Sequence, residues 1–165
     1  LEPIANTPRR NDILVFHSVE EDLDVVKRAV GVPGDTLEMR GGLLFRNGTR
    51  VDEPYAIRSN ANKSESPAMR EKMRAWQVRH LAGADPATYA PDLHDWGPIV
   101  VPPRSYFMMG DNRDESYDGR YWGFLPRTNV RGRPLLVYYS YDKESWKPLP
   151  FISAIRWNRL FSTPE

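Results

Sequence analysis

Residues 110–126 read GDNRDESYDGRYWGFLP and join two apolar segments of the chain. The stretch holds three glycines, three aspartates, two arginines and one serine. Ordering such a loop is costly, because its charged groups need partners and no helix or strand ladder satisfies its backbone. The stretch therefore predicts that the rest of the chain forms a scaffold that holds this loop in place.

One strand offers a reactive group to that loop. Residues 25–32, VVKRAVGV, predict a central β-strand that is apolar on both faces. Side chains alternate along a strand, so Lys27 shares a face with Val25 and Ala29. Most strand lysines extend to water. A lysine held among apolar neighbours would instead have a lowered pKa, and its neutral amine could take a proton from a serine hydroxyl.

The remaining pattern predicts a mainly β fold. Short apolar runs bounded by turn signals predict strands, and Asn47-Gly48 is a strong signal for a hairpin turn. The segment 155–161 fits either a strand or a short helix. The other expected strands are 13–16, 37–40, 43–46, 49–51, 99–101, 106–109 and 135–140.

An insertion interrupts the β pattern at residues 56–95. A helix is predicted over about residues 67–81, with Ser66 as its N-cap, Pro67 at its first position and Gly83 as its C-terminal stop.

Apolar residues form one stripe on this helix, at Met69, Met73 and Trp76. The stripe is narrow, which favours packing on the β body over binding to a membrane surface, although a basic opposite face leaves the second reading open. The resulting organisation is a β core formed by residues 1–55 and 96–165, with the insertion between them.

Composition limits the functional classes. The chain has 165 residues, a formal net charge of +1 and no cysteine. The charge argues against a nucleic-acid partner, and the absence of cysteine excludes disulfides and zinc–thiolate sites. No apolar run is long enough to span a membrane. His80 and His94 lack a matching ligand set, so we expect no metal site and no cofactor.

Three separated motifs resemble those of the bacterial type I signal peptidases, also called leader peptidases. They are GDNRDESYDGRYWGFLP at 110–126, KRAVGVPGD at 27–35 and RNDILVF at 10–16. The segments WGPIVVP at 96–102 and IRWNRL at 155–160 also fit the family, and the order of the motifs is the same.

The resemblance implies a serine endopeptidase that removes signal peptides from exported preproteins. It implies a fold of antiparallel sheets or a partly open barrel. It also implies an N-terminal anchor in the bacterial cytoplasmic membrane, with the catalytic domain on the extracytoplasmic side.

The resemblance also assigns roles to residues. Lys27 matches the general base, and Ser116 matches the serine whose hydroxyl orients the lysine amine. The residues that match the charged or polar supports of the loop are Arg28, Asp111, Asn112, Arg113, Asp118 and Arg120. Those that match positions bordering the substrate are Val15, Asp24, Val25 and Val26.

The sequence departs from the family pattern in two places. The family's nucleophile belongs to a Ser-x-Met-x-Pro motif that precedes residues 10–16, and this sequence has no such motif. We expect the nucleophile and the membrane anchor to lie before Leu1, and we expect the chain as given to be inactive. Gly119 stands where the family usually has serine, which is expected to loosen the loop slightly.

Two other functional classes stay open. One is an inactive homologue or binding module that keeps the fold without the serine. The other is a relative of the self-cleaving repressors, which also use serine and lysine. The 17-residue loop signature and the lack of a DNA-binding segment argue against the second.

Overall fold

The computed structural model describes residues 7–60 and 62–134. They form a five-stranded sheet in the order β8-β7-β2-β1-β9 and a four-stranded sheet in the order β5-β4-β3-β6. The strands are β1 Ile13–His17, β2 Asp24–Gly31, β3 Thr36–Arg40, β4 Leu43–Arg46, β5 Thr49–Arg50, β6 Trp96–Val100, β7 Ser105–Met109, β8 Leu125–Pro126 and β9 Val130–Gly132. The helices are α1 Pro67–Gln77, η1 Val78–His80, α2 Gly119–Trp122 and η2 Arg127–Asn129.

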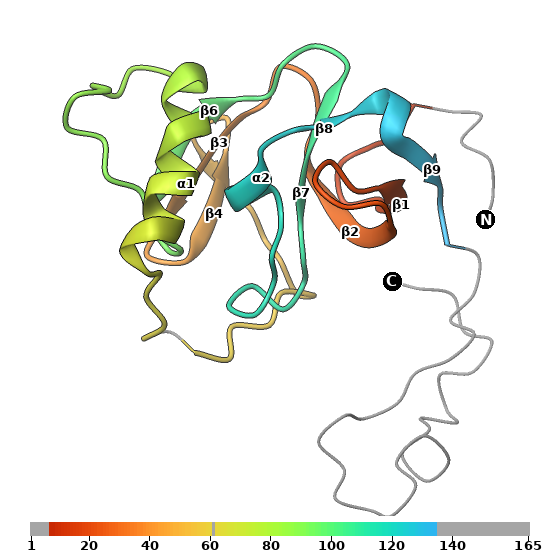
Figure 1. Cartoon of the computed structure of the whole chain (residues 1–165), viewed down its shortest axis with the longest axis horizontal. Coiled ribbons are helices and arrows are strands. Elements are labelled where there is room, and N and C mark those ends of the chain that lie inside the picture. The colour runs from red at the N-terminus through yellow and green to blue at the C-terminus, as the bar shows by residue number, and fades with distance from the viewer. Residues whose placement is uncertain (1–6, 61, 135–165) are drawn as a thin grey trace, which may run out of the picture.

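Every pairing between these strands is antiparallel, which confirms the predicted fold class. Neither sheet closes into a barrel over the described ranges. Figure 1 shows α1 beside the sheet of β3, β4 and β6, with β1, β2 and β9 at the opposite end and β7 between them. The expected strand at 135–140 and the segment 155–161, expected as a strand or a short helix, lie outside the described residues.

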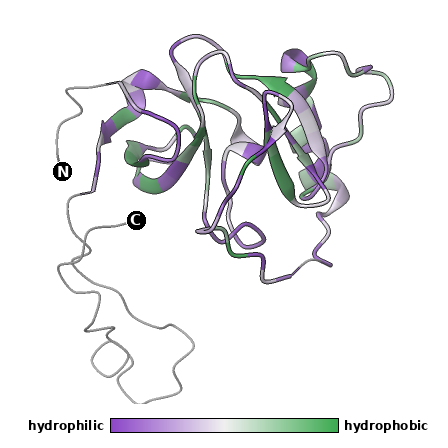
Figure 2. Ribbon diagram, turned by 180° about the vertical axis from the view of Figure 1, so that it is seen from behind, coloured by the Kyte–Doolittle hydropathy of each residue, from purple (hydrophilic) through white to green (hydrophobic). Residues whose placement is uncertain are grey.

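Strand β2 occupies the middle of the larger sheet, and from Arg28 to Gly31 it is buried on both faces. It begins and ends one residue earlier than predicted. Ala29 packs into a core cluster with Leu14 and Phe16, whereas Val30 packs into a second cluster with Leu37 and Phe107. This alternation explains why the strand is apolar on both faces, and Figure 2 shows hydrophobic residues gathered on the strands.

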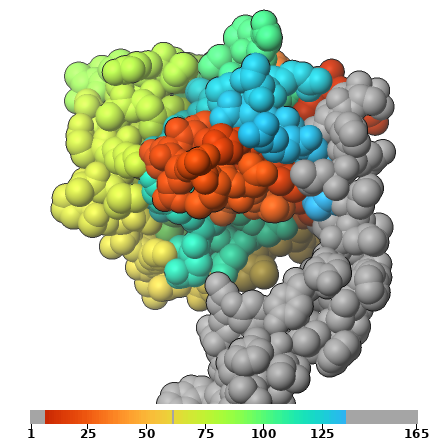
Figure 3. All heavy atoms as spheres, turned by 45° about the vertical axis from the view of Figure 1, so that its right-hand side comes forward, coloured from red at the N-terminus to blue at the C-terminus, as the bar shows by residue number. Residues whose placement is uncertain are grey.

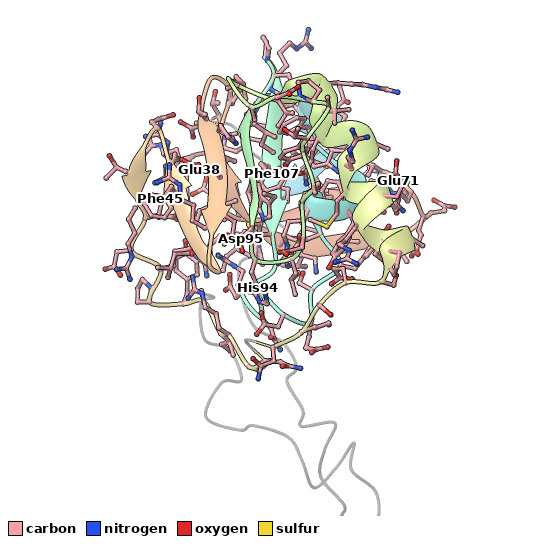
Figure 4. All side chains as sticks on the ribbon, turned by 90° about the vertical axis from the view of Figure 1, so that its left-hand side faces the viewer. Glu38, Phe45, Glu71, His94, Asp95 and Phe107 are labelled. Atoms are coloured by element: carbon pink, nitrogen blue, oxygen red, sulfur yellow. The ribbon has the colours of Figure 1, made fainter. Side chains whose placement is uncertain are left out.

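Two tight turns set the register of the smaller sheet. Asn47 and Gly48 both have positive φ, of 52° and 79°, as the predicted hairpin turn requires. This turn joins β4 to β5, and a second turn at 41–42 joins β3 to β4. Between the sheets, Phe107 of β7 is fully buried and faces the region beneath α1 (Figure 4).

Helix α1 begins as predicted. Ser66 caps it by accepting a hydrogen bond from the backbone N–H of Met69, and Pro67 is its first residue. Met73 is completely buried in the core, and Met69 and Trp76 pack against that core. The apolar stripe is therefore a packing face, as the sequence favoured.

The end of this helix was predicted four residues too late. The α-helix ends at Gln77, and a 3₁₀ turn follows. Leu81 adopts an extended conformation because it forms a bridge with Ile99, and the backbone N–H of Ala82 donates to the carbonyl of Pro98. Pairing with β6 thus replaces the last predicted turn of the helix, and Gly83 does not cap it.

The signature loop is more regular than its composition suggested. Residues 119–122 form the short helix α2, and β8 pairs with β7 at residues 125–126. The expectation that 110–126 lacks a helix or strand ladder was therefore wrong for its second half. Within the described ranges, no helix has the length and apolarity needed to cross a membrane.

Candidate active site

The amine of Lys27 contacts the signature loop. Lys27 lies on β2 opposite Leu14 of β1, and its Nζ atom donates a hydrogen bond of 2.9 Å to Ser116 Oγ. This contact is the one expected from the sequence, and the lysine does not extend freely into solvent. The two residues are 89 positions apart in the chain, so the sheet and the loop together create the pair.

Burial lowers the pKa of the Lys27 amine below its ordinary value. The carboxylate of Asp118 acts in the opposite direction, the guanidinium of Arg120 adds to the lowering, and Asp111 opposes it again. The lowering by burial and by Arg120 exceeds the raising by the two carboxylates, so the net shift of the Lys27 pKa is downward. The site therefore favours a neutral amine more than solvent would, which is what a proton acceptor needs.

A buried ion pair of Asp118 and Arg120 acts electrostatically on this amine. Asp118 and Arg120 are 0% and 1% exposed, and Arg120 Nε donates to Asp118 Oδ1 over 2.9 Å. Burial alone would raise the pKa of Asp118, but Arg120 and the backbone N–H groups of Gly110 and Arg120 hold it below its usual value. Asp118 also caps α2, so one carboxylate orders both the loop and the helix.

A second ion pair joins the loop to the same strand. Arg28, next to Lys27, donates two hydrogen bonds to Asp111 at 2.9 and 2.8 Å, so two of the residues that match supports of the loop pair with each other. Its guanidinium also lies over the ring of Tyr55, 3.9 Å from the centroid. The pairing fixes the start of the loop against β2.

Arg113 has a partner that the sequence did not predict. It donates two hydrogen bonds of 2.7 Å to Glu53, and both side chains are almost completely buried. Arg113 also donates to the carbonyl oxygen of Gly110. Glu53 follows the last hairpin in an acidic, proline-containing stretch, and nothing in the local sequence distinguishes it from other acidic residues.

The insertion holds the loop from the other side. The backbone of Ile57 pairs with the loop on both sides of Asn112, and the side-chain amide of Asn112 accepts a long hydrogen bond from Ser59. Asn112 therefore anchors the loop to the insertion. Trp76 and Gln77 of α1 both donate to the carbonyl oxygen of Arg120.

Further contacts join the insertion to Asp114 of the loop. The backbone N–H of Asn60 donates to the buried carboxylate of Asp114 over 2.6 Å. His94 Nε2 lies 3.2 Å from the other carboxylate oxygen, and Figure 4 shows His94 at the rim of the structure beneath β6. The insertion is thus part of the support of the site. The spacing of residues in the sequence could not reveal this, because the contacting residues do not recur at helix or strand intervals.

Gly119 has a role different from the expected loosening of the loop. It is buried, and a Cβ atom there would lie 2.8 Å from the carbonyl oxygen of Met108 and 3.1 Å from the ring of Phe107. The glycine lets α2 pack closely on β7. A side chain at this position would require a shift of the helix.

The four residues expected near the substrate do not share one surface. Val15 and Val26 are direct neighbours on β1 and β2, with Val26 53% exposed and Val15 buried beside it. Asp24 is exposed at the start of β2, while Val25 points to the other face, where it lines a small hollow with Tyr117. Figure 3 shows the red-orange β1–β2 hairpin between the blue residues around β9 and the teal residues that follow β7.

One edge of β2 is open at this place. The Asp24–Lys27 segment pairs with β1 on one side. On its other side β7 pairs only from Arg28 onward, so within the described residues no strand occupies this edge. The open edge leads directly to the Lys27 amine. Among the same residues, no group of three potential ligands is arranged to hold a metal ion.

The sequence model of the family described as "Signal peptidase, peptidase S26" matches residues 2–139. This chain belongs to that family. The match includes the strand that carries Lys27, the insertion and the whole signature loop.

Individual relatives agree with this assignment. Signal peptidase I S of Bacillus subtilis (strain 168) is 38% identical over 135 residues, which cover 81% of this chain and 61% of the relative. Signal peptidase I of Leptolyngbya laminosa is 32% identical over 146 residues, covering 84% of this chain and 56% of the relative. The chain therefore spans somewhat more than half the length of these relatives.

A solved structure shares the fold. The crystal structure of a signal peptidase I from Enterococcus faecalis V583 superposes with a TM-score of 0.52 at 30% sequence identity. The superposition covers 78% of this chain and 97% of that one. The two-sheet architecture with its helical insertion is thus the fold of this family.

Proposed function

We propose that this chain is the catalytic part of a serine endopeptidase that removes signal peptides from exported preproteins, with Lys27 as its general base. The observation that carries the proposal is the 2.9 Å hydrogen bond between Lys27 Nζ and Ser116 Oγ. Family membership supports the reaction class, and the lowered pKa of Lys27 supports the role of the amine.

The proposed chemistry begins with a serine hydroxyl placed next to Lys27. The neutral amine removes the proton of that hydroxyl while its oxygen attacks the scissile carbonyl. The resulting ammonium then gives its proton to the leaving amine, and an acyl-enzyme forms. Water, deprotonated by Lys27 in turn, releases the signal peptide as a carboxylate.

Ser116 acts in this scheme as a positioning residue. Its hydroxyl accepts a hydrogen bond from the Lys27 amine and so fixes the orientation of that amine. The nitrogen lone pair, or the proton that replaces it in the ammonium, then points in a defined direction. Asp118 lies near enough to favour the ammonium that forms during the reaction. The loop therefore supports both protonation states of Lys27 without reacting itself.

The open edge of β2 supports the proposed mode of substrate binding. An extended peptide can add to the Asp24–Lys27 edge as a further strand, with backbone hydrogen bonds for affinity and side-chain hollows for selectivity. Val26 with Val15 on one face and Val25 on the other would border side chains on the two opposite faces of such a peptide. Small side chains, of the alanine type, are expected at the first and third positions before the cut.

The nucleophile and the membrane anchor belong to the proposal as well. The sequence has no Ser-x-Met-x-Pro motif, so we place the attacking serine on a segment that precedes Leu1, together with the anchor. The protein would then act at the bacterial cytoplasmic membrane, with the domain described here on the extracytoplasmic side.

The test uses the full-length protein that contains this chain. It is incubated with a preprotein that carries alanine at the first and third positions before the expected cut, and the new N-terminus of the product is sequenced. A product that begins at the expected residue supports the proposal. An intact preprotein, or a full-length protein without the serine motif, favours the inactive homologue.

A further inference from the structure

A hollow adjoins Ser116 on the side of the insertion. It has a volume of about 200 Å³ and is open to solvent. The signature loop contributes Glu115, Ser116 and Tyr117 to its wall, and the insertion contributes Glu65 and Met69. None of the roles argued above for the site makes use of this hollow.

The hollow is connected to the open strand edge through Lys27 and Ser116. A peptide on the Asp24–Lys27 edge reaches the Lys27 amine, which touches Ser116, and Ser116 lines the hollow. Tyr117 also lines the smaller hollow beside Val25, so the two hollows share this residue. Tyr117 thus forms part of the wall of the hollow near the strand and of the hollow next to Ser116.

Tyr117 is held firmly in that place. Its ring stacks on Tyr121, with centroids 5.0 Å apart, and its hydroxyl donates to Glu20 on the β1–β2 turn over 2.6 Å. Lys72 of α1 donates to the same hydroxyl and pairs with Glu20 at 2.7 Å. These bonds join the insertion to the turn through Tyr117, so the wall has a defined position.

The charges around the hollow are unequal. The amine of Lys63 is engaged by Glu115 at 3.2 Å and by the carbonyl oxygen of Asp114. Glu65 accepts a hydrogen bond of 2.6 Å from the neutral hydroxyl of Tyr121, and no cation of the described chain pairs with it. Two carboxylates therefore face one ammonium, and the hollow is acidic overall.

We propose that this hollow receives the side chain of the first residue after the cut, and that Glu65 makes it favour neutral or basic side chains over acidic ones. The proposal rests on the proposed function, because it assumes a peptide cut next to Lys27. An acidic side chain would be placed near the uncompensated carboxylate of Glu65, which repels it. Met69 and Tyr121 would contact the apolar part of the side chain.

A charge test compares three preproteins that differ only in the first residue after the cut, which is alanine, lysine or glutamate. The full-length protein and its Glu65→Gln variant are compared by the ratio of kcat/KM for the glutamate and alanine substrates. We expect Glu65→Gln to raise this ratio by about threefold or more, because the removed charge acts over a short distance in a partly open site. Glutamine can still accept the hydrogen bond from Tyr121, so the wall of the hollow is kept.

The matched control is Glu71→Gln. Glu71 is exposed on the outer side of α1, the helix that follows Glu65 (Figure 4), and it does not line the hollow. This variant should leave the ratio unchanged. An equal response of both variants, or no response to Glu65→Gln, overturns the proposed selectivity.

A location test does not depend on turnover. A substrate peptide that carries the photoreactive residue p-benzoylphenylalanine as the first residue after the cut is bound to the full-length Lys27→Ala protein and irradiated. Benzophenone reacts readily with methionine, so we expect the label on Met69. Labelling confined to the β1–β2 turn overturns the assignment of the hollow.

The two tests separate the two proposals. If the alanine substrate is cut but the ratio and the label disagree with the expectations, the subsite is wrong and the proposed function stands. If no substrate is cut, the proposed function fails, and the label alone decides whether the hollow binds the peptide.

Discussion

Gly110 and Ser116 approach so closely that a Cβ atom on Gly110 would lie 2.2 Å from Ser116 Oγ. The same atom would lie 3.4 Å from Lys27 Nζ. A real Cβ atom does not come as near as 2.2 Å to another heavy atom. Any larger residue at position 110 must therefore displace the Ser116 hydroxyl. The glycine at the start of the loop is therefore part of the geometry that brings Ser116 to Lys27.

Gly110→Ala should reduce catalysis more than it reduces stability. Displacing Ser116 by a fraction of an ångström or more is expected to lower kcat by about tenfold or more, since positioning errors are costly in active sites. The overpacking should cost about 1–3 kcal/mol of folding free energy. Full-length protein is assayed for preprotein cleavage and for unfolding in urea. Full activity together with unchanged stability would show that the loop adjusts without moving Ser116.

Ser116→Ala should weaken the reaction less than the loss of Lys27 does. It removes one orienting hydrogen bond, worth about 1–2 kcal/mol, so kcat/KM should fall by roughly tenfold. The control is Ser105→Ala on β7, whose hydroxyl donates a long hydrogen bond to the nearby Pro103 carbonyl and, within residues 7–60 and 62–134, to no other group. If Ser116→Ala is as inactive as Lys27→Ala at equal stability, the serine has a larger role than orientation.

Lys27→Met should make the folded protein more stable at neutral pH. The folded state holds Lys27 with a lowered pKa, whereas the unfolded chain returns it to about 10.4. The unfolded state therefore binds more protons, and wild-type stability rises with pH through the window between the two pKa values. The advantage of Lys27→Met is expected to shrink toward zero as the pH passes the ordinary lysine value.

The matched control is Lys72→Met, for which we expect the opposite effect on stability at neutral pH. Hydrogen bonds to Glu20 and Tyr117 raise the pKa of Lys72, so its contribution is favourable at neutral pH and is lost as the pH rises. Both variants are followed by urea unfolding across an alkaline pH series. A Lys27→Met difference that does not change with pH contradicts the lowered pKa.

Asp118→Asn should be strongly destabilising. It leaves the guanidinium of Arg120 buried without its counter-charge, for which a loss of about 3–5 kcal/mol is expected. Glu38→Gln is the comparison, because it breaks a pair with Arg40, whose side chain is 60% exposed; that pair should contribute about 1 kcal/mol or less. Similar urea midpoints for the two variants would mean that burial of the Asp118–Arg120 pair does not govern its strength.

The sequence predicted the elements whose information is local. Turn chemistry placed the hairpin at Asn47-Gly48, an N-cap serine and a proline placed the start of α1, and alternation made β2 a central strand. The Lys27–Ser116 contact followed from family motifs, since nothing local joins residues 89 positions apart. The motifs also indicated that Arg28 supports the loop, but not that its partner is Asp111.

Tertiary contacts decided what the sequence could not predict. The end of α1 depends on the bridge between Leu81 and Ile99, which lies in a distant strand. Glu53 became the partner of Arg113 only because the last hairpin folds back toward the loop. The hollow beside Ser116 likewise requires the insertion and the loop to meet, and neither segment shows it alone.

The most direct measurement compares preprotein cleavage by the full-length protein and by its Lys27→Ala variant, with thermal unfolding as evidence that both are folded. The account predicts that the variant folds and that its cleavage rate falls by about a thousandfold or more, because no base then removes the serine proton. Ser105→Ala should cleave like the unmodified protein. A folded Lys27→Ala variant that still cleaves at a rate near that of the unmodified protein would contradict the assignment of Lys27 as the general base.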